Sequence, residues 1–191
     1  MEQTDEQLIE EFFAGNPKCM EIIFHRHKIR VFNYALRVLA NRADAEDTTS
    51  DIFLKLSSKQ FTFQPQAKFT TWLYRIVHNA CIDRLRRQKK IFSWKIKTED
   101  GEEKEWDLAD EKDLPREELD QKEKGILIRK SIDRLPLQQK EAILLREYQN
   151  LSYQEISEIL DCSLESVKIL IFRARESLKK ELAPLFREGS L

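Results

Sequence analysis

The chain has 191 residues, of which 41% are hydrophobic and 35% charged, and its formal net charge is −1. That length allows one large domain or two small ones, and the 4 glycines and 5 prolines are too few for a turn-rich all-β sandwich or barrel. No apolar run approaches the roughly 20 residues of a membrane span. The acidic N-terminus lacks a secretion signal, and three widely spaced cysteines fit reduced thiols. We therefore expect a cytoplasmic, mostly helical protein without membrane insertion.

Residues 1–92 predict a first domain of four helices. The apolar periodicity places these helices at about 4–14, 16–39, 44–58 and 69–90. Thr4 and Gln7 form the pattern of a capping box at the start of the first helix. Asn16 is expected to cap the second helix, which has Pro17 in its first turn.

Charge is divided unevenly along the chain. Residues 68–97 hold nine basic residues against one acidic residue, whereas residues 98–123 hold thirteen acidic residues against four basic ones. This order favours a polyanion-binding surface followed by a solvated or polyanion-mimicking segment. A helix surface followed by a floppy linker is the simpler alternative. Because residues 93–114 lack a sustained period, we expect them to form an acidic, flexible and largely disordered linker.

Residues 115–191 predict a second domain that ends in a helix-turn-helix. Helices are expected at about 115–134 and 136–148, and a capping box at Ser152 and Glu155 opens a short third helix. A tight turn at 161–163 connects it to a long last helix, as in helix-turn-helix motifs. The outer face of that helix has the mixed character that insertion into a major groove requires: Ser166, Lys168, Ile169, Phe172 and Arg173. An ordinary helical hairpin with a solvated face fits the same pattern.

The helix over 69–90 is a second candidate for nucleic-acid binding. Four of its polar residues, spaced by three or four positions, are predicted to share one face: Asn79, Asp83, Arg86 and Arg87. Trp72 near its start and Phe63 just before it place aromatic rings beside a basic surface, which suits unstacked bases. In the alternative, Trp72 is a core residue and Asp83 forms a surface ion pair with Arg87 that contributes little.

Catalytic and metal-binding interpretations find little support. His25 and His27 alternate across a helix, and His78 with Cys81 has no second pair to complete a tetrahedral metal site. The chain also lacks a glycine-rich loop that could cradle phosphate. We therefore expect no catalytic residues, no metal, no cofactor and no enzymatic activity.

Three stretches of the sequence carry a resemblance to a known family. They are DAED at 44–47 with DIF at 51–53; FTTWLYRI at 69–76 with Asn79, Asp83 and 85–87; and LSYQEI at 151–156 with 161–162, 167–168 and 172–175. In this order, over nearly the whole chain and with an acidic linker between the halves, they resemble the extracytoplasmic-function sigma factors. These are two-domain initiation factors of bacterial RNA polymerase in the sigma-70 family.

The resemblance implies a role for each half. The first domain would bind the clamp helices of the polymerase's largest subunit through Asp47 and Asp51, which we expect to need a basic partner outside the domain. It would open and read the promoter −10 element through Phe63, Lys68, Trp72, Asn79, Arg86 and Arg87. The second domain would meet the polymerase flap and read the −35 element through Ser166, Lys168, Ile169, Phe172 and Arg173. The linker would thread toward the active-site and RNA-exit channels, and an anti-sigma factor would be a further partner.

Three departures from the family pattern affect these roles. Ser50 stands where many members have glutamine, which removes a polar contact. Ile169 and Leu170 follow Lys168 where many members have serine and arginine, so −35 recognition is expected to lean on apolar contact with thymine methyl groups. Glu165 replaces a common glycine and would repel phosphate unless it accepts from a cytosine amino group.

Together these patterns predict an all-α chain of two small domains, 1–92 and 115–191, joined by the linker 93–114. We expect a sigma factor that binds core RNA polymerase and promoter DNA and promotes strand separation. The alternative is an autonomous helix-turn-helix regulator. A regulator would bind its operator unaided, whereas a sigma factor binds core polymerase and has weak affinity for duplex DNA alone.

Overall fold

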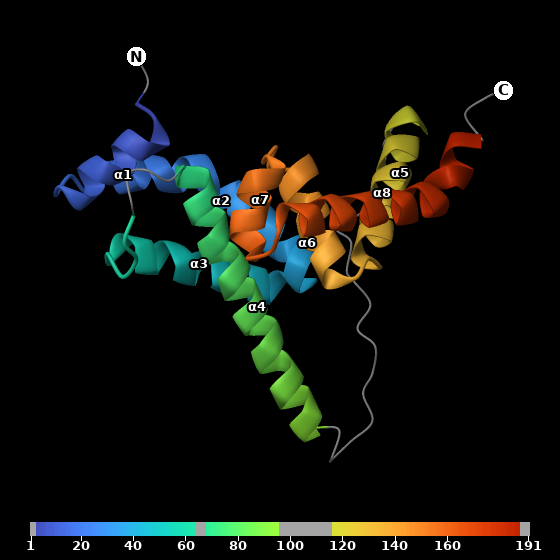
Figure 1. Cartoon of the computed structure of the whole chain (residues 1–191), viewed down its shortest axis with the longest axis horizontal. Helices are drawn as coiled ribbons and strands as arrows, with labels where there is room; N and C mark the ends of the chain where they lie inside the picture. The colour runs from blue at the N-terminus through green and yellow to red at the C-terminus, as the bar shows by residue number, and fades with distance from the viewer. Residues whose placement is uncertain (1–2, 64–67, 96–115, 188–191) are drawn as a thin grey trace.

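The computed structural model describes residues 3–63, 68–95 and 116–187, and all the regular structure in these ranges is helical. The helices, shown in Figure 1, are α1 (Asp5–Phe13), α2 (Lys18–Leu39), α3 (Arg42–Ser57), α4 (Phe69–Lys95), α5 (Arg116–Asp133), α6 (Leu137–Glu147), α7 (Tyr153–Leu160) and α8 (Leu164–Arg187). None of the described helices is long and apolar enough to span a bilayer.

Capping residues begin several helices where the sequence predicts them. At α1, the backbone N–H of Gln7 donates to the Thr4 hydroxyl at 3.3 Å, and the Thr4 N–H donates to the Gln7 side chain at 3.0 Å. The same reciprocal pair joins Ser152 and Glu155 at the start of α7. Both capping boxes are confirmed. Each satisfies two backbone N–H groups that the helix cannot pair internally.

Two predictions about helix ends need correction. Asn16 does not cap α2, because its side-chain amide instead donates to the Glu11 carboxylate at 3.3 Å. The short connection through Gly15, whose φ is 114°, places Asn16 beside the last turn of α1, where this charged acceptor is available. At the other end of the domain, α4 continues to Lys95 instead of about Lys90. It therefore includes the first residues of the predicted linker, and the rest of that linker lies outside the described residues.

The first four helices pack around a shared apolar core. Helix α2 lies against α1, α3 and α4, and apolar residues from all four helices are buried: Leu8, Ile23, Val31, Ile52, Leu56, Leu73 and Val77. Leu54 is an exception, since its side chain is 65% exposed although it lies within the apolar part of α3. A position two residues from Ile52 and two from Leu56 falls on the opposite side of a helix.

The last four helices form the second unit, in which α8 packs against α5, α6 and α7. Apolar residues spaced by three and four positions form the inner stripe of α8: Val167, Ile171 and Ala174 are buried, and Leu178 is partly buried. Helix α7 ends at Asp161, which adopts the left-handed conformation with φ 51°. The Ser163 hydroxyl then accepts from the Ser166 N–H at 3.1 Å and so caps α8. Short helix, tight turn and long helix together form a helix-turn-helix.

The two units also contact each other. Helix α4 lies against α7 and α2 lies against α6, in the middle of the molecule as drawn in Figure 1. Several side chains cross this boundary, among them Glu141 of α6, which is within 2.7 Å of His78 on α4. Two domains predicted to be separate along the chain thus share a packed interface.

Within the first domain, Asp5 ties α1 to α2. Its carboxylate lies 2.7 Å from His27 Nε2 and 2.7 Å from an Arg26 guanidinium nitrogen. The hydrogen bond with His27 lowers the pKa of Asp5 below its ordinary value of 3.8, and contact with Arg26 adds to this although partial burial opposes it. The folded state therefore favours the charged form of Asp5.

We expect Asp5→Asn to lower the free energy of unfolding near neutral pH by about 1–3 kcal/mol, as for a lost hydrogen bond to a charged group. Because the folded-state pKa is depressed, this stabilisation is complete above the unfolded pKa and is lost as pH falls through the lower folded value. Urea denaturation at pH values from about 7 down to about 2 should show that the difference in free energy of unfolding between variant and parent shrinks as the pH falls. The control is Asp51→Asn, which changes an exposed carboxylate. If the stability difference between Asp5→Asn and the parent is the same at every pH, ionised Asp5 does not stabilise the fold in this way.

Candidate nucleic-acid interface

Helix α4 presents two rows of side chains, and each row lines a different cavity. Asn79, Asp83 and Arg87 line a cavity of about 460 Å³ between α3 and α4, here called the α3–α4 cavity. His78, Ile82 and Arg86 line a cavity of about 590 Å³ between the domains, here called the interdomain cleft. The single face predicted for Asn79, Asp83, Arg86 and Arg87 therefore holds only in part. Arg86 lines the other cavity, but it still lies 3.8 Å from Asp83, so the surface ion pair expected between Asp83 and Arg87 is formed with Arg86 instead. Neighbouring residues of a helix point about 100° apart, so Arg86 faces the second domain and Arg87 does not.

The α3–α4 cavity combines the groups that an unpaired base requires. Its wall includes the aromatic rings of Phe61 and Trp72, the amide of Asn79 and the guanidinium groups of Arg75 and Arg87. Aromatic rings stack on bases, an amide reads their edges, and arginines neutralise phosphate. Asn79 and Arg87 are exposed, so both are accessible to a ligand.

Trp72 and Phe63 form an aromatic cluster with Phe69 at the start of α4. The Trp72 ring centroid lies 5.2 Å from that of Phe63 and 5.7 Å from that of Phe69, and its indole N–H donates to the Thr62 carbonyl at 3.0 Å. Phe63 is only 8% exposed, so its ring is occupied by packing. Trp72 is half-buried and also lines the cavity, so the core interpretation of Trp72 is correct in part.

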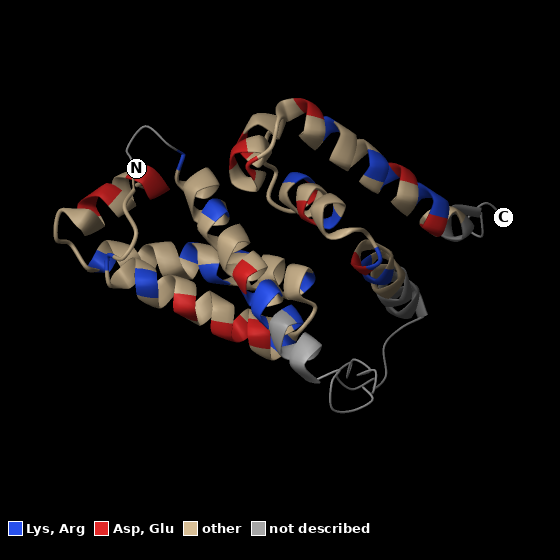
Figure 2. Ribbon diagram, turned by 60° about the horizontal axis from the view of Figure 1, so that its bottom comes forward, with Lys and Arg blue, Asp and Glu red and all other residues tan. Residues whose placement is uncertain are grey.

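Acidic residues on α3 face basic residues on α4, as Figure 2 shows. Arg84 bridges Asp44 at 2.8 Å and Asp47 at 3.1 Å, and Gln88 also donates to Asp44. The hydrogen bond with Asp44 raises the pKa of Arg84. Asp47 therefore has a basic partner inside the domain, although Asp47 and Asp51 were both expected to need one outside it. Asp51 is exposed, makes no ion pair with any described residue, and lines the α3–α4 cavity.

The outer face of α8 is partly apolar. Ile169 is 50% exposed and Phe172 is 66% exposed, and the neighbouring Lys168 and Arg173 are exposed as well. Ser166 is partly buried, and its hydroxyl lies 2.9 Å from that of Ser163 in the helix cap. Exposed apolar side chains between basic ones can contact thymine methyl groups and phosphates at once.

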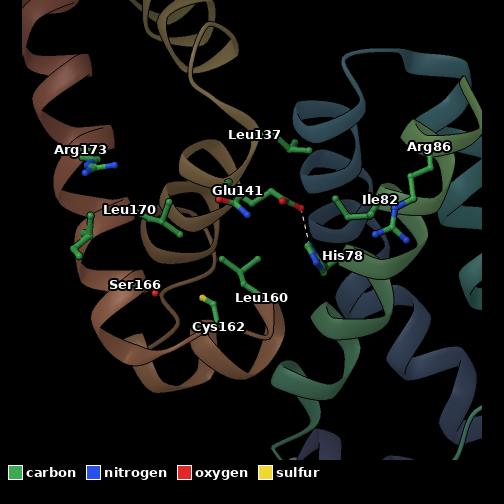
Figure 3. Close-up of a pocket in the computed structure, with 12 residues that line it drawn as sticks. His78, Ile82, Arg86, Leu137, Glu141, Leu160, Cys162, Ser166, Leu170 and Arg173 are labelled. Carbon is green, nitrogen blue, oxygen red and sulfur yellow. Dashed lines mark hydrogen bonds and ion pairs between the residues drawn. The ribbon is translucent and has the colours of Figure 1, made fainter. Parts of the chain in front are cut away.

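Several residues predicted for different promoter elements lie close together. Lys68, from the −10 set, forms an ion pair of 3.1 Å with Glu155 of α7. Arg86, also from the −10 set, lines the interdomain cleft together with Ser166, Ile169 and Arg173 of the −35 set. Figure 3 shows α4 and α8 on opposite sides of this cleft. The sequence analysis assigned these residues to separate domains, so it did not predict that residues of the −10 and −35 sets would lie next to each other.

Sequence reasoning missed four residues that shape these surfaces. Arg84 is one of several arginines in this stretch, and nothing in the sequence marks it as the one that pairs with the acids of α3. Leu54 and Phe24 line a shallow cavity of about 410 Å³ between α2 and α3, and the signal for Leu54 was its position off the buried stripe. Glu141 is an acid that directly precedes a buried apolar run, which could have marked it. The described residues contain no group of three or more His, Cys, Asp and Glu side chains suited to a metal ion.

The fold and these surfaces define a class of protein. It combines a helix-turn-helix in the second domain with a first domain in which aromatic, amide and basic groups line a cavity. Residues 23–91 match the family model of sigma-70 region 2, and residues 126–178 match that of sigma-70 region 4.

Whole-chain relatives agree with these two matches. The chain is 32% identical over 186 residues to the ECF RNA polymerase sigma-E factor of Haemophilus influenzae, covering 95% of this chain and 97% of that protein. It is 29% identical over 191 residues to the RNA polymerase sigma-H factor of Pseudomonas aeruginosa, covering 98% of each. The fold resembles the sigma factor RpoE of Bartonella quintana, solved with the anti-sigma factor NepR, with a TM-score of 0.68 and 21% identity over 85% of this chain and 96% of that one.

The chain therefore belongs to the extracytoplasmic-function sigma factors of the sigma-70 family. It is a promoter-recognising sigma factor of RNA polymerase. An autonomous helix-turn-helix regulator is not favoured, because the first half of the chain also matches the sigma-70 family.

Proposed function

We propose that this sigma factor captures an unpaired base of the −10 element in the α3–α4 cavity. The observation that carries this proposal is the convergence of Trp72, Asn79 and Arg87 on one wall. In this arrangement the Asn79 amide hydrogen-bonds the base edge, the indole ring supports stacking, and Arg87 contacts the backbone. Phe63 supports Trp72 from the core, and Lys68 and Arg86 contact the flanking phosphates.

The −35 element is read by the outer face of α8. Ile169 and Phe172 contact thymine methyl groups, while Lys168, Ser166 and Arg173 contact phosphates or base edges in the major groove. The exposure of Lys168, Ile169, Phe172 and Arg173 opposite the buried stripe supports the assignment. Residues 1–92 and 115–191 form the two reading domains and 93–114 the linker, a division supported by the spans of the two family matches.

Partners and location follow from the same assignment. Asp47 and Asp51 on α3 contact basic residues of the polymerase clamp, and the second domain meets the flap. An anti-sigma factor regulates the chain, which is supported by the complex in which the Bartonella quintana relative was solved. The protein acts in the cytoplasm by binding and strand separation, and performs no covalent chemistry.

Arg173→Ala tests the −35 assignment. We expect binding to a −35 duplex to weaken by roughly 1–3 kcal/mol, with relaxed preference at one position, because Arg173 is exposed and has no ion pair among the described residues. Fluorescence anisotropy with a set of single-base-substituted duplexes measures both effects. The matched control is Arg175→Ala, since Arg175 is already paired with Glu147 at 2.7 Å. Uniform loss across all duplexes would show that Arg173 contacts phosphate instead of a base.

A further inference from the structure

The outer face of α8 carries a stripe of four exposed side chains that runs along the helix axis. Each of them lies two positions before a buried or partly buried residue of the inner stripe, so it points about 200° away from that residue. The four are Glu165, Ile169, Phe172 and Glu176. This set, here called the central stripe, therefore has an acid at each end and two apolar side chains between them.

Basic residues flank the central stripe on both sides. Lys168 and Lys179 each lie three positions after an acid of the stripe, and Lys180 lies four positions after Glu176. They therefore point away from the stripe by about 60° on one side and about 40° on the other. All three lysines are exposed, and acidic and basic positions alternate along α8 in Figure 2. A helix in a major groove has base edges before its centre and phosphates along both borders, so the stripe faces the bases.

Glu165 is exposed in the first turn of α8, and the fold does not use its carboxylate. In the part of the chain that the structure describes, this side chain makes no hydrogen bond and no ion pair. The helix is capped instead by Ser163, whose hydroxyl accepts from the Ser166 N–H at 3.1 Å. Glu155, by contrast, completes the capping box of α7 and pairs with Lys68. Both carboxylate oxygens of Glu165 are therefore available to a ligand.

The chemistry of an ionised carboxylate limits which base Glu165 can contact. A carboxylate only accepts hydrogen bonds, so it is repelled by phosphate and by the acceptor atoms that guanine and thymine present in the major groove. Adenine presents an amino group beside the acceptor N7, whereas cytosine presents its N4 amino group without an acceptor beside it. The first residues of a recognition helix are also the ones that reach base edges. Cytosine is therefore the base that suits a carboxylate at this position.

We propose that Glu165 is a specificity-determining residue of this sigma factor, and that it selects a cytosine of the −35 element by accepting a hydrogen bond from the N4 amino group. Ile169 lies about 6 Å further along the helix, or about two base steps. The cytosine is therefore within about two base pairs of a thymine whose methyl group contacts Ile169. This inference rests on the proposed reading of the −35 element by α8 and deepens it by naming the base.

Glu165→Gln tests the proposal because it should exchange one base preference for another. A glutamine amide both donates and accepts, so it pairs bidentately with N6 and N7 of adenine. The templates are promoter duplexes with a randomised upstream block and a constant premelted −10 region. We expect core polymerase carrying the parent chain to select cytosine at one position of that block. With Glu165→Gln it should select adenine there, and with Glu165→Ala it should select neither base.

Binding to two defined templates measures the size of this effect. We expect the parent holoenzyme to bind the selected template roughly tenfold more tightly than a template with adenine in place of the cytosine, as for one mismatched base pair. Glu165→Gln should reverse this order. The matched control is Glu176→Gln, the same substitution on the same stripe but about 16 Å further from the start of α8, and it should keep the preference of the parent. Circular dichroism verifies the helical content of each variant.

Two results would overturn the proposal. One is a Glu165→Gln holoenzyme that selects the same bases as the parent, which means that the carboxylate only stabilises the positive end of the helix dipole. The other is a parent holoenzyme whose preference at the position altered by Glu165→Gln is for a base other than cytosine.

Failure of the proposed function gives a different result. If the parent holoenzyme selects no sequence in the upstream block, α8 does not read a −35 element. If it selects a sequence that Arg173→Ala alters and Glu165→Gln does not, α8 reads the element and only the role of Glu165 is wrong.

Discussion

Asn79→Ala is expected to reduce open-complex formation by roughly five- to a hundredfold, which corresponds to about 1–3 kcal/mol for a lost base contact, while leaving binding to a −35 duplex unchanged. The reason is that Asn79 is exposed in the α3–α4 cavity and its partner, an unpaired base, exists only after strand separation. Abortive initiation with core polymerase, on duplex and on premelted promoter templates, measures the effect. Premelting should not rescue Asn79→Ala, because the base contact is still missing.

Two comparison variants make this experiment decisive. Trp72→Ala should be rescued at least partly by a premelted bubble if the indole ring assists melting, although it also loses the hydrogen bond to Thr62. Arg173→Ala should show the opposite pattern, with weaker duplex binding that premelting of the −10 region does not restore. Equal loss for all three variants on both templates would indicate general misfolding and would contradict the division of roles between α4 and α8.

Asp51→Arg is expected to weaken binding to core polymerase at least about tenfold, or about 1.4 kcal/mol, because charge reversal turns an attraction into a repulsion across the interface. Asp51 is exposed and makes no ion pair with described residues, so the fold should tolerate the change. Competition with labelled parent for core polymerase measures it, and Glu176→Arg, an exposed reversal on α8, is the control. If Asp51→Arg competes as well as the parent, Asp51 does not contact the clamp. If that variant is also defective in open-complex formation, Asp51 acts in the α3–α4 cavity instead.

Asp47→Arg gives a less direct answer. It should also weaken polymerase binding, but it places a second guanidinium beside Arg84, which now bridges Asp44 and Asp47. We therefore expect this variant to lower the stability of the α3–α4 contact as well. Thermal unfolding of the free chain separates the two effects, since Asp51→Arg should leave the unfolding temperature nearly unchanged.

Residue patterns predicted the helices more accurately than the surfaces. The capping boxes at Thr4 and Ser152 and the buried stripe of α8 follow from spacings of three and four residues within one helix. The same spacing rule grouped Arg86 with Asn79 and Arg87, and this was correct only in part. Arg86 pairs with Asp83 but lines a different cavity, because the cavity that a residue lines depends on the elements packed around α4. Asn16 is a second example of a contact that spacing does not predict. Its side chain pairs with Glu11 of α1 and therefore does not cap α2.

The all-α class and the helix-turn-helix could be predicted from the residues alone, because they depend on local propensity, capping and hydrophobic periodicity, and the family resemblance rests on short motifs in a fixed order. Which surfaces meet could not be predicted in this way, because that depends on contacts between distant segments. His78 and Glu141 are 63 positions apart, and Thr71 and Glu155 are 84 apart, and no periodic pattern relates residues over such distances. These contacts form only when helices that are distant in the sequence pack together, so the arrangement of the two domains is a property of the tertiary packing.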